Sequence, residues 1–171
     1  MILAYRGKYP EIAETAFVDE SAVVIGDVRI GEHSSIWYNA VVRGDVNYIT
    51  IGENTNVQDG VIIHVTQIEY PTEIGDNVTI GHAAVLHGCK IKSNSLIGIG
   101  AIVLDGALIE EYCIVAAGSL VPPRAKYPSN SLILGSPAKV ARKLNDKDIE
   151  MIKEGAIDYK ELKEYYKGMK K

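Results

Sequence analysis

The sequence has few cysteines and no marked excess of charge, and both features exclude whole classes of protein. Its two cysteines, Cys89 and Cys113, form no CxxC pair and are too few for the disulfide framework of a small secreted domain. A net charge of −4 provides no basic surface for nucleic acid or acidic lipid. With 47% hydrophobic residues, the 171-residue chain is expected to fold as one domain with a sizeable core.

Long apolar runs are also missing. No run approaches the roughly 18 residues that a membrane-spanning helix needs, so no membrane association is expected. The start, Met1-Ile2-Leu3-Ala4-Tyr5-Arg6-Gly7, has no basic region followed by an apolar stretch, and therefore does not resemble a secretory signal. We expect a soluble, cytoplasmic protein, and the scarcity of cysteine agrees with a reducing compartment.

What the sequence does have is a six-residue repeat. Branched aliphatic residues, here called anchors, recur at every sixth position with a few irregular steps. This period fits neither the 3.6-residue period of a helix nor the simple alternation of an ordinary strand. The anchors are Val18, Val24, Ile30, Ile36, Val42, Ile51, Val57, Ile63, Ile74, Ile80, Leu86, Ile91, Ile97, Val103, Ile109, Val115 and Val121.

The repeat predicts an all-β chain coiled as a triangular prism, with one short strand on each side and three hexads in each turn. Most anchors are followed four positions later by a small or β-branched residue, which fits the room left beside a large inward side chain. Glycines at corners relieve backbone strain. The pattern resembles the single-stranded, left-handed parallel β-helix proteins built from hexapeptide repeats. The alternative is a β-sandwich with regularly spaced strands.

The remaining segments are expected to complete one domain over residues 1–171. Residues 1–15 are interpreted as an N-terminal cap, residues 16–121 as the β-helix, residues 122–144 as a connecting segment and residues 145–168 as a C-terminal helical segment. Pro122-Pro123 is expected to stop the coil. Asn145 or Asp146 is expected to cap a helix that breaks near Gly155 and then resumes, lying along the prism.

Three of the four histidines, His64, His82 and His87, fall close together in the sequence and suggest a metal site. His64 and His87 each follow an anchor on the same side of the prism, one turn apart. Rungs lie about 4.8 Å apart, so these two imidazoles can reach one metal at roughly 2.0–2.1 Å. His82 lies on the adjacent side, whose side chains diverge from the first. A neighbouring chain must therefore supply it, which predicts a homotrimer with one site at each interface.

Four polar residues are expected around this site. Arg43 lies on the side of His64 and His87 one turn earlier, with Asp45 two residues further on, and Asp59 lies one turn before His82. Arg43 should pair with Asp59 across the interface; the alternative for Arg43 and Asp45 is an ordinary surface pair. Gln58 is expected to orient a water or hydroxide at the metal, or else to satisfy the backbone at a corner.

Several motifs together resemble the gamma-class carbonic anhydrase family over most of the coil. They are Val41-Val42-Arg43-Gly44-Asp45-Val46-Asn47, Asn56-Val57-Gln58-Asp59-Gly60, His64, Ile80-Gly81-His82, Leu86-His87-Gly88-Cys89 and Gly135-Ser136-Pro137-Ala138-Lys139. The resemblance implies a trimer with Zn²⁺ or Fe²⁺ on His64, His82 and His87. It also implies reversible hydration of carbon dioxide to bicarbonate by a metal-bound hydroxide. Arg43, Asp45, Gln58 and Asp59 would support the site, and Tyr159 is aligned with a family tyrosine near it.

The chain departs from the best-characterised family type at two places that serve proton transfer there. Val46 stands where that type has glutamate, and the segment from Val65 to Glu73 is short, with Glu69 and Glu73 as its carboxylates. The sequence therefore predicts metal binding and leaves the rate of turnover open. Two alternatives remain open: a weakly active or non-catalytic metal-binding trimer, and a hexapeptide-repeat acyltransferase that uses one histidine as general base.

Overall fold

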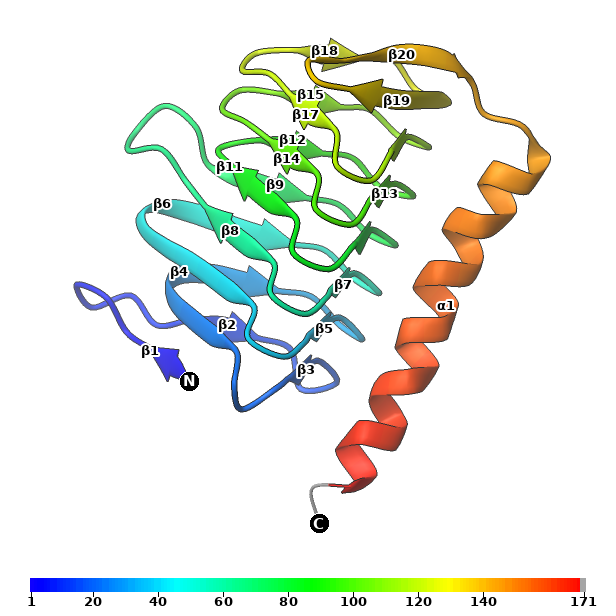
Figure 1. Ribbon diagram of the computed structural model, residues 1–171. Coiled ribbons are helices and arrows are strands. Elements are labelled where there is room, and N and C mark those ends of the chain that lie inside the picture. Colours follow the sequence, from blue (N-terminus) through cyan, green and yellow to red (C-terminus); the bar gives the residue numbers. More distant parts are fainter. Residues whose placement is uncertain (170–171) are drawn as a thin grey trace.

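The computed structural model describes residues 1–169 and confirms a left-handed parallel β-helix with one helix beside it (Figure 1). Successive turns stack along the prism axis. Each anchor pairs with the anchor one turn on, as in the row from Val42 through Ile63 to Leu86. These side chains are fully buried and fill the axis of the coil. No helix within residues 1–169 is long and apolar enough to cross a membrane.

The prism has three sides, and each carries one strand from every turn. Side 1 holds the first halves of β4 (Val23–Ile30) and β6 (Val41–Ile51), then β8 (Ile62–His64), β11 (Val85–His87), β14 (Ile102–Val103) and β17 (Leu120–Val121), with β1 (Ile2–Leu3) paired to β4. Side 2 holds the second halves of β4 and β6, then β2 (Glu11–Ile12), β9 (Thr72–Ile74), β12 (Lys90–Ile91), β15 (Leu108–Ile109) and β18 (Lys126–Tyr127).

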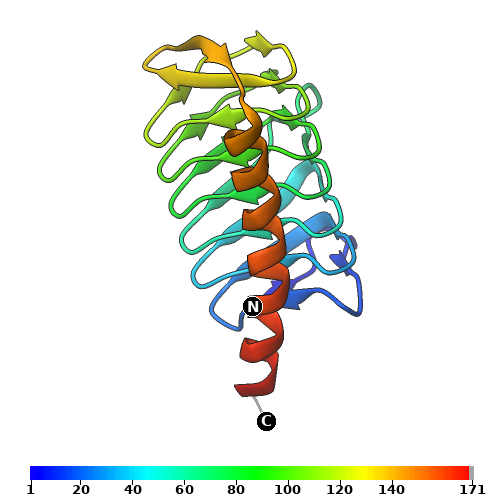
Figure 2. The same cartoon turned by 90° about the vertical axis from the view of Figure 1, so that its right-hand side faces the viewer.

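Side 3 is covered by the helix. Its strands are β3 (Phe17–Val18), β5 (Ser35–Ile36), β7 (Asn56–Val57), β10 (Thr79–Ile80), β13 (Leu96–Ile97), β16 (Ile114–Val115) and β19 (Ser131–Gly135). The long helix α1 (Asp146–Met169) lies along this side and crosses several turns of the coil (Figure 2). An aromatic cluster secures the contact, because Trp37 meets Tyr159 and Tyr166 edge-on at centroid distances of 5.4 and 5.0 Å.

The coil is longer than predicted. Residue 121 is not its end, because β18 and β19 continue the ladders of sides 2 and 3. Pro122 and Pro123 are tolerated because they follow β17, the last strand of side 1, so no further turn on that side needs a backbone N–H from them. The last edge is then covered by β20 (Ala138–Lys143), which returns antiparallel to β19. At the other end, β1 and β2 lie within the expected N-terminal cap and pair with β4.

The helix begins as predicted but does not break. Asn145 and Asp148 form a reciprocal cap, in which each backbone N–H donates to the other's side chain, at 2.8 and 3.1 Å. The expected interruption near Gly155 is wrong, since α1 is continuous from Asp146 to Met169. Gly155 instead faces Thr79, where an added Cβ would lie 3.2 Å from the hydroxyl oxygen. The glycine thus allows α1 to approach side 3 closely.

Glycine is required at some corners because consecutive turns come too close for a side chain. At Gly98 an added Cβ would lie 2.5 Å from the backbone nitrogen of Ala117. We therefore expect Gly98→Ala to lower the free energy of unfolding by about 1–3 kcal/mol through overpacking. Denaturant unfolding measures this, with Gly168→Ala as control because nothing lies within 4 Å of the corresponding Cβ. Equal unfolding midpoints for wild type and Gly98→Ala would contradict the close approach.

All three irregular steps of the repeat lie at one corner, between sides 1 and 2. The anchors are nine residues apart from Val42 to Ile51, eleven from Ile63 to Ile74 and five from Leu86 to Ile91. The first two steps insert extra chain, which protrudes at the left edge of Figure 1 as the bend of β6 and the loop after β8. The third lies directly after His87. Departures from the repeat are thus concentrated beside two of the three candidate ligands.

Candidate metal centre

His64 and His87 are stacked one turn apart, as the hexad register predicts. They end β8 and β11 and are paired in register on side 1. The Nδ1 atom of His64 lies 3.1 Å from the Nε2 atom of His87. A tetrahedral zinc ion with bonds of about 2.0–2.1 Å separates two of its ligand nitrogens by about 3.3 Å. The spacing of the two facing nitrogens therefore fits a shared ion.

A carboxylate holds the outer nitrogen of each ring. Nε2 of His64 lies 2.9 Å from Oδ1 of Asp45, and Nδ1 of His87 lies 2.7 Å from Oδ1 of Asp105. An ionised carboxylate only accepts hydrogen bonds, so each neutral ring carries its proton on the outer nitrogen. Both inner nitrogens are then bare lone pairs facing each other. Two lone pairs at this distance repel, and a metal ion bound between the rings would remove that repulsion.

Asp45 is the link between His64 and Arg43. It contacts Nη1 of Arg43 through its second oxygen, and it comes from the protruding bend of β6. Burial alone would raise the pKa of Asp45, but hydrogen bonds from His64 and Arg43, together with their charges, hold that pKa below its ordinary value. Asp45 is thus kept as a carboxylate that can orient His64. The predicted contact of Arg43 with Asp59 of a second subunit stays a prediction.

His82 lies on a different part of the surface, just after β10 on side 3, in agreement with its predicted place on the adjacent side. Its Nδ1 atom is 2.9 Å from Oδ2 of Asp59, which lies one turn earlier as expected. Among residues 1–169, no three His, Cys, Asp or Glu side chains of one chain are grouped so that they could hold a metal. The stacked pair therefore supplies two candidate ligands, and His82 lies at another edge.

Gln58 supports the backbone that carries His82. Its side-chain carbonyl accepts a hydrogen bond from the His82 N–H at 3.2 Å, and its amide nitrogen donates to Oδ1 of Asn56 at 3.1 Å. The side chain is buried, with 6% of its surface exposed. Of the two roles considered for Gln58, the geometry of the chain favours the corner amide that satisfies the backbone.

Tyr159 lies on α1, where the helix packs against side 3, and it is near Asp59. It projects from α1 onto Trp37. Burial raises the pKa of Tyr159, and the negative charges of Asp59 and of Tyr166 raise it further. The hydroxyl of Tyr159 is therefore kept protonated in the neutral pH range and can act as a hydrogen-bond donor on the His82 side of the site.

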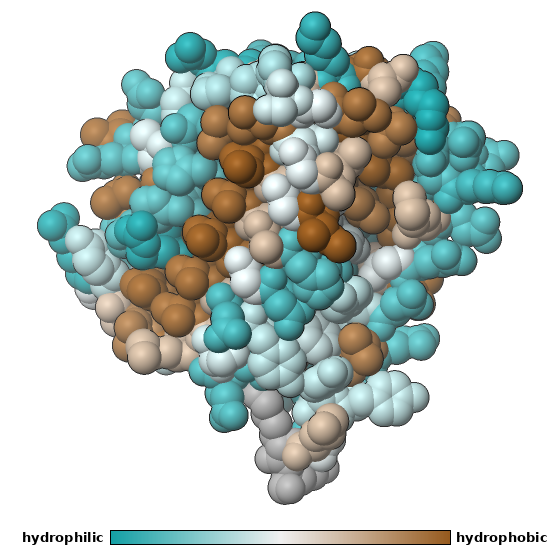
Figure 3. Space-filling view, viewed as in Figure 1, coloured by the Kyte–Doolittle hydropathy of each residue, from teal (hydrophilic) through white to brown (hydrophobic). Residues whose placement is uncertain are grey.

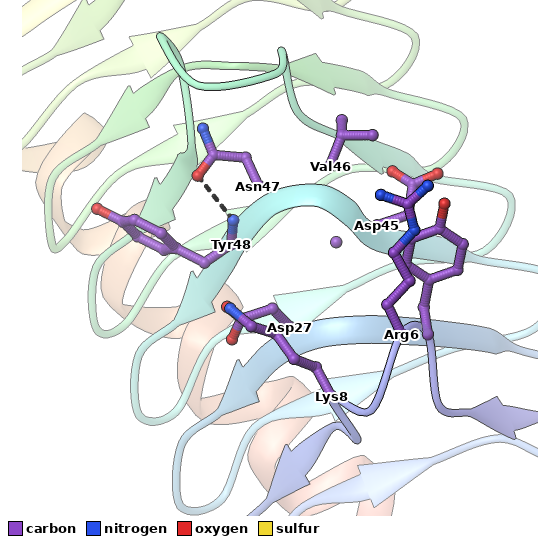
Figure 4. A pocket seen from close by; sticks show the side chains of 9 residues that line it. Arg6, Lys8, Asp27, Asp45, Val46, Asn47 and Tyr48 are labelled. Carbon is purple, nitrogen blue, oxygen red and sulfur yellow. Dashed lines mark hydrogen bonds and ion pairs between the residues drawn. The ribbon is translucent and has the colours of Figure 1, made fainter.

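A hollow of about 300 Å³ lies between the N-terminal residues and the bend of β6, next to Asp45 (Figure 4). Val46 borders this hollow, and its aliphatic side chain is exposed. The resemblance described above leads one to expect a glutamate at this position. The carboxylate of Glu73 is engaged by two other side chains. It forms an ion pair with Lys90 and accepts a hydrogen bond from the Tyr48 hydroxyl at 2.8 Å. The hydrogen bond from Lys90, above all, lowers the pKa of Glu73. Glu69, the other carboxylate of this segment, is exposed.

Two residues of the site were missed by the sequence analysis. They are Asp105 and Thr66, whose hydroxyl donates to Oδ1 of Asp105 at 2.9 Å. The hexad register contained a signal for Asp105: Leu86 pairs with Val103, so Asp105 stands one turn after Gly88 and next to His87. Thr66 has no such signal, because it lies in the loop inserted after β8.

The outer surface differs between the three sides. Side 2 presents charged residues such as Arg29, Glu73 and Lys90, and side 3 is covered by α1. Side 1 instead presents an outward row of aliphatic residues beside the histidine pair, one from each turn, and hydrophobic surface gathers there in Figure 3. This row, here called the apolar ladder, consists of Val23, Val41, Ile62, Val85, Ile102 and Leu120.

Comparison with known proteins places the whole coil and its helix among related sequences. Residues 88–123 match the bacterial transferase hexapeptide (six repeats) family. The chain is 47% identical over 159 residues to the probable carbonic anhydrase of Methanocaldococcus jannaschii, covering 93% of this chain and 99% of that protein. It is 48% identical over 160 residues to the mitochondrial gamma carbonic anhydrase 1 of Arabidopsis thaliana, covering 91% of this chain but only 58% of that protein.

A solved structure has the same fold over nearly the whole chain. The crystal structure of a Bacillus cereus protein described as a putative acetyltransferase superposes with a TM-score of 0.95 at 44% identity, covering 98% of this chain and 97% of that one. The chain spans just over half the length of the plant relative, and nearly all of the archaeal and Bacillus proteins.

Proposed function

Because the chain belongs to the gamma carbonic anhydrase family, we propose that it is a carbonic anhydrase that hydrates carbon dioxide reversibly to bicarbonate. The reaction takes place at metal sites between the subunits of a homotrimer. His64 and His87 of one subunit and His82 of the next are the proposed ligands. Zn²⁺ is the favoured metal, and Fe²⁺ is an alternative with the same ligands.

The observation that carries this proposal is the facing pair of ring nitrogens, Nδ1 of His64 and Nε2 of His87, which lie 3.1 Å apart. Asp45 and Asp105 fix both rings from outside, which is the arrangement that metal-bound histidines use in other proteins. A histidine acting alone as general base, as in an acyltransferase, needs no second imidazole against it. The paired geometry therefore favours metal chemistry over acyl transfer.

The trimer follows from the three unlike sides of the prism. Side 3 is covered within the chain and side 2 is charged, so the apolar ladder of side 1 is the surface that gains most from burial against another subunit. Cyclic contact of side 1 with the edge that bears His82 closes three identical interfaces. Each interface then combines the histidine pair of one subunit with His82 of the next.

Residues around the proposed ligands would orient the histidine rings and balance the charge of the site. A bound zinc or ferrous ion supplies Lewis acidity, which makes water a competent nucleophile near neutral pH. Asp45 orients His64, Asp59 orients His82, and Gln58 holds the backbone of His82 in place. Arg43 neutralises Asp45 within the chain and is proposed to meet Asp59 across the interface. Tyr159 is proposed to donate a hydrogen bond on the His82 side.

Proton removal distinguishes this chain from the best-characterised type of the family, which has a glutamate at the position of Val46. Val46 cannot accept a proton and Glu73 is engaged by Lys90. Glu69, exposed in the loop after β8, is the remaining carboxylate of that segment. We therefore expect the hydration rate to rise with buffer concentration, because buffer bases replace a fixed proton acceptor.

A stopped-flow assay of carbon dioxide hydration tests the proposal, on protein loaded separately with Zn²⁺ and with Fe²⁺ under anaerobic conditions. Hydration above the uncatalysed rate, abolished by a chelator and restored by metal, is the expected result. Metal-loaded trimer without activity would reduce the function to metal binding. Binding of acetyl-coenzyme A by metal-free protein, with no hydration, would instead favour an acyltransferase.

A further inference from the structure

We propose that Asp105 is a positioning residue of the metal site. Its carboxylate holds the His87 ring so that Nε2 faces His64, and Thr66 in turn holds the carboxylate. This inference rests on the proposed function, because it assigns Asp105 a part in metal binding. The contacts that carry it are 2.7 Å from Nδ1 of His87 to Oδ1 of Asp105 and 2.9 Å from the Thr66 hydroxyl to the same oxygen.

Asp105 and Thr66 come from separate parts of the chain and converge only at the irregular corner. Asp105 lies on the turn that follows β14, one rung beyond His87, and Thr66 lies in the loop inserted after β8, one rung before it. Oδ1 of Asp105 therefore contacts two groups, Nδ1 of His87 and the hydroxyl of Thr66. Because the Thr66 hydroxyl holds this oxygen, the contact favours one orientation of the His87 ring.

Gly88 makes this approach possible. It follows His87 directly and adopts a positive φ of 55°. A Cβ at this position would lie 2.3 Å from Oδ1 of Asp105 and 2.8 Å from Cβ of Tyr70. The backbone also brings the two turns together here, since Gly106 N–H donates to the Gly88 carbonyl at 2.7 Å. A side chain at residue 88 would thus displace the Asp105 carboxylate from His87. Gly88 is therefore needed for the contact between Asp105 and His87.

The two outer carboxylates make the histidine pair selective for a cation between the rings. Asp45 sets the proton of His64 on Nε2, and Asp105 sets the proton of His87 on Nδ1. The two rings therefore present opposite nitrogens, Nδ1 and Nε2, to the same point. Without Asp105 nothing in this network would stop the ring of His87 from turning over, and the Nε2 lone pair would no longer be directed at the ion.

Chelator competition measures the affinity of the intact protein for Zn²⁺ in wild type, Asp105→Ala and Asp105→Asn. Loss of an outer partner of a metal ligand typically weakens metal binding about 10–100-fold, which is the expected effect of Asp105→Ala. Asp105→Asn keeps an acceptor oxygen and should retain part of the affinity. Asp158→Ala, which removes an exposed carboxylate from α1, is the matched control and should bind like wild type.

Two further measurements separate positioning from simple loss of structure. The visible absorption of bound Co²⁺ reports the geometry of its ligands and should change in Asp105→Ala but not in Asp158→Ala. Thr66→Val removes only the hydroxyl that holds Asp105, and should weaken Zn²⁺ binding several-fold even if Asp105→Ala misfolds. Unchanged Zn²⁺ affinity and Co²⁺ spectra in folded Asp105→Ala, or unchanged affinity in Thr66→Val where Asp105→Ala misfolds, would overturn the inference. Wild-type protein that binds neither ion would instead refute the proposed metal site itself.

Discussion

Replacing His82 by alanine is expected to remove the metal from the purified trimer while leaving the fold intact. His82 is one of three proposed ligands, so its loss should weaken binding by more than the roughly 10–100-fold caused by loss of an outer partner. The fold should survive because the His82 side chain is 44% exposed and pairs with Asp59 at the surface. Elemental analysis after gel filtration gives the metal content, and circular dichroism gives the fold.

A second histidine provides the control for this experiment. His33 lies outside the stacked pair and adopts a positive φ of 60°, so asparagine is the substitution that its backbone tolerates best. His33→Asn should keep about the wild-type metal content and hydration rate. If His82→Ala retains its full complement of zinc or iron as a folded protein, the assignment of His82 as a ligand is wrong, whatever the roles of His64 and His87.

Introducing a charge into the apolar ladder is expected to have the other large effect. Ile62 is 47% exposed in the single chain and lies near the middle of the ladder. In the proposed trimer, Ile62→Lys would bury an ammonium group at every interface, at an effective cost of several kcal/mol for each ion. We expect monomers of 18.6 kDa in analytical ultracentrifugation instead of trimers. Metal should be lost as well, because His82 of the neighbouring subunit is no longer present.

The matched control places the same charge on another side of the prism. Leu108 occupies the equivalent outward position of β15 on side 2, among charged neighbours. Leu108→Lys should remain a trimer with its metal bound. Trimeric, metal-loaded Ile62→Lys would show that side 1 is not the interface. Monomeric protein that still holds the ion tightly would show that one chain completes the site unaided.

The hexad count alone was enough to determine the type of coil, though not where it ends, and the stacking of two candidate ligands. Inward anchors must meet anchors of the next turn, because any other register would expose them, and this places His87 over His64. The same count put His82 on a different side, one turn after Asp59. These predictions succeeded because backbone ladders with a constant period convert sequence distance directly into position.

Only the tertiary structure decided what happens where the period fails. The extra residues after Val42 and Ile63, and the missing one after Leu86, break the count at the corner that carries Asp45, Thr66 and Asp105. The path of an irregular corner depends on which neighbouring turn its backbone and side chains can pack against. The same holds for two local predictions that failed. The coil continues past Pro122-Pro123 because β18 pairs with β15 of the preceding turn. The helix α1 continues through Gly155 because it packs against side 3 there, which outweighs the low helix propensity of glycine.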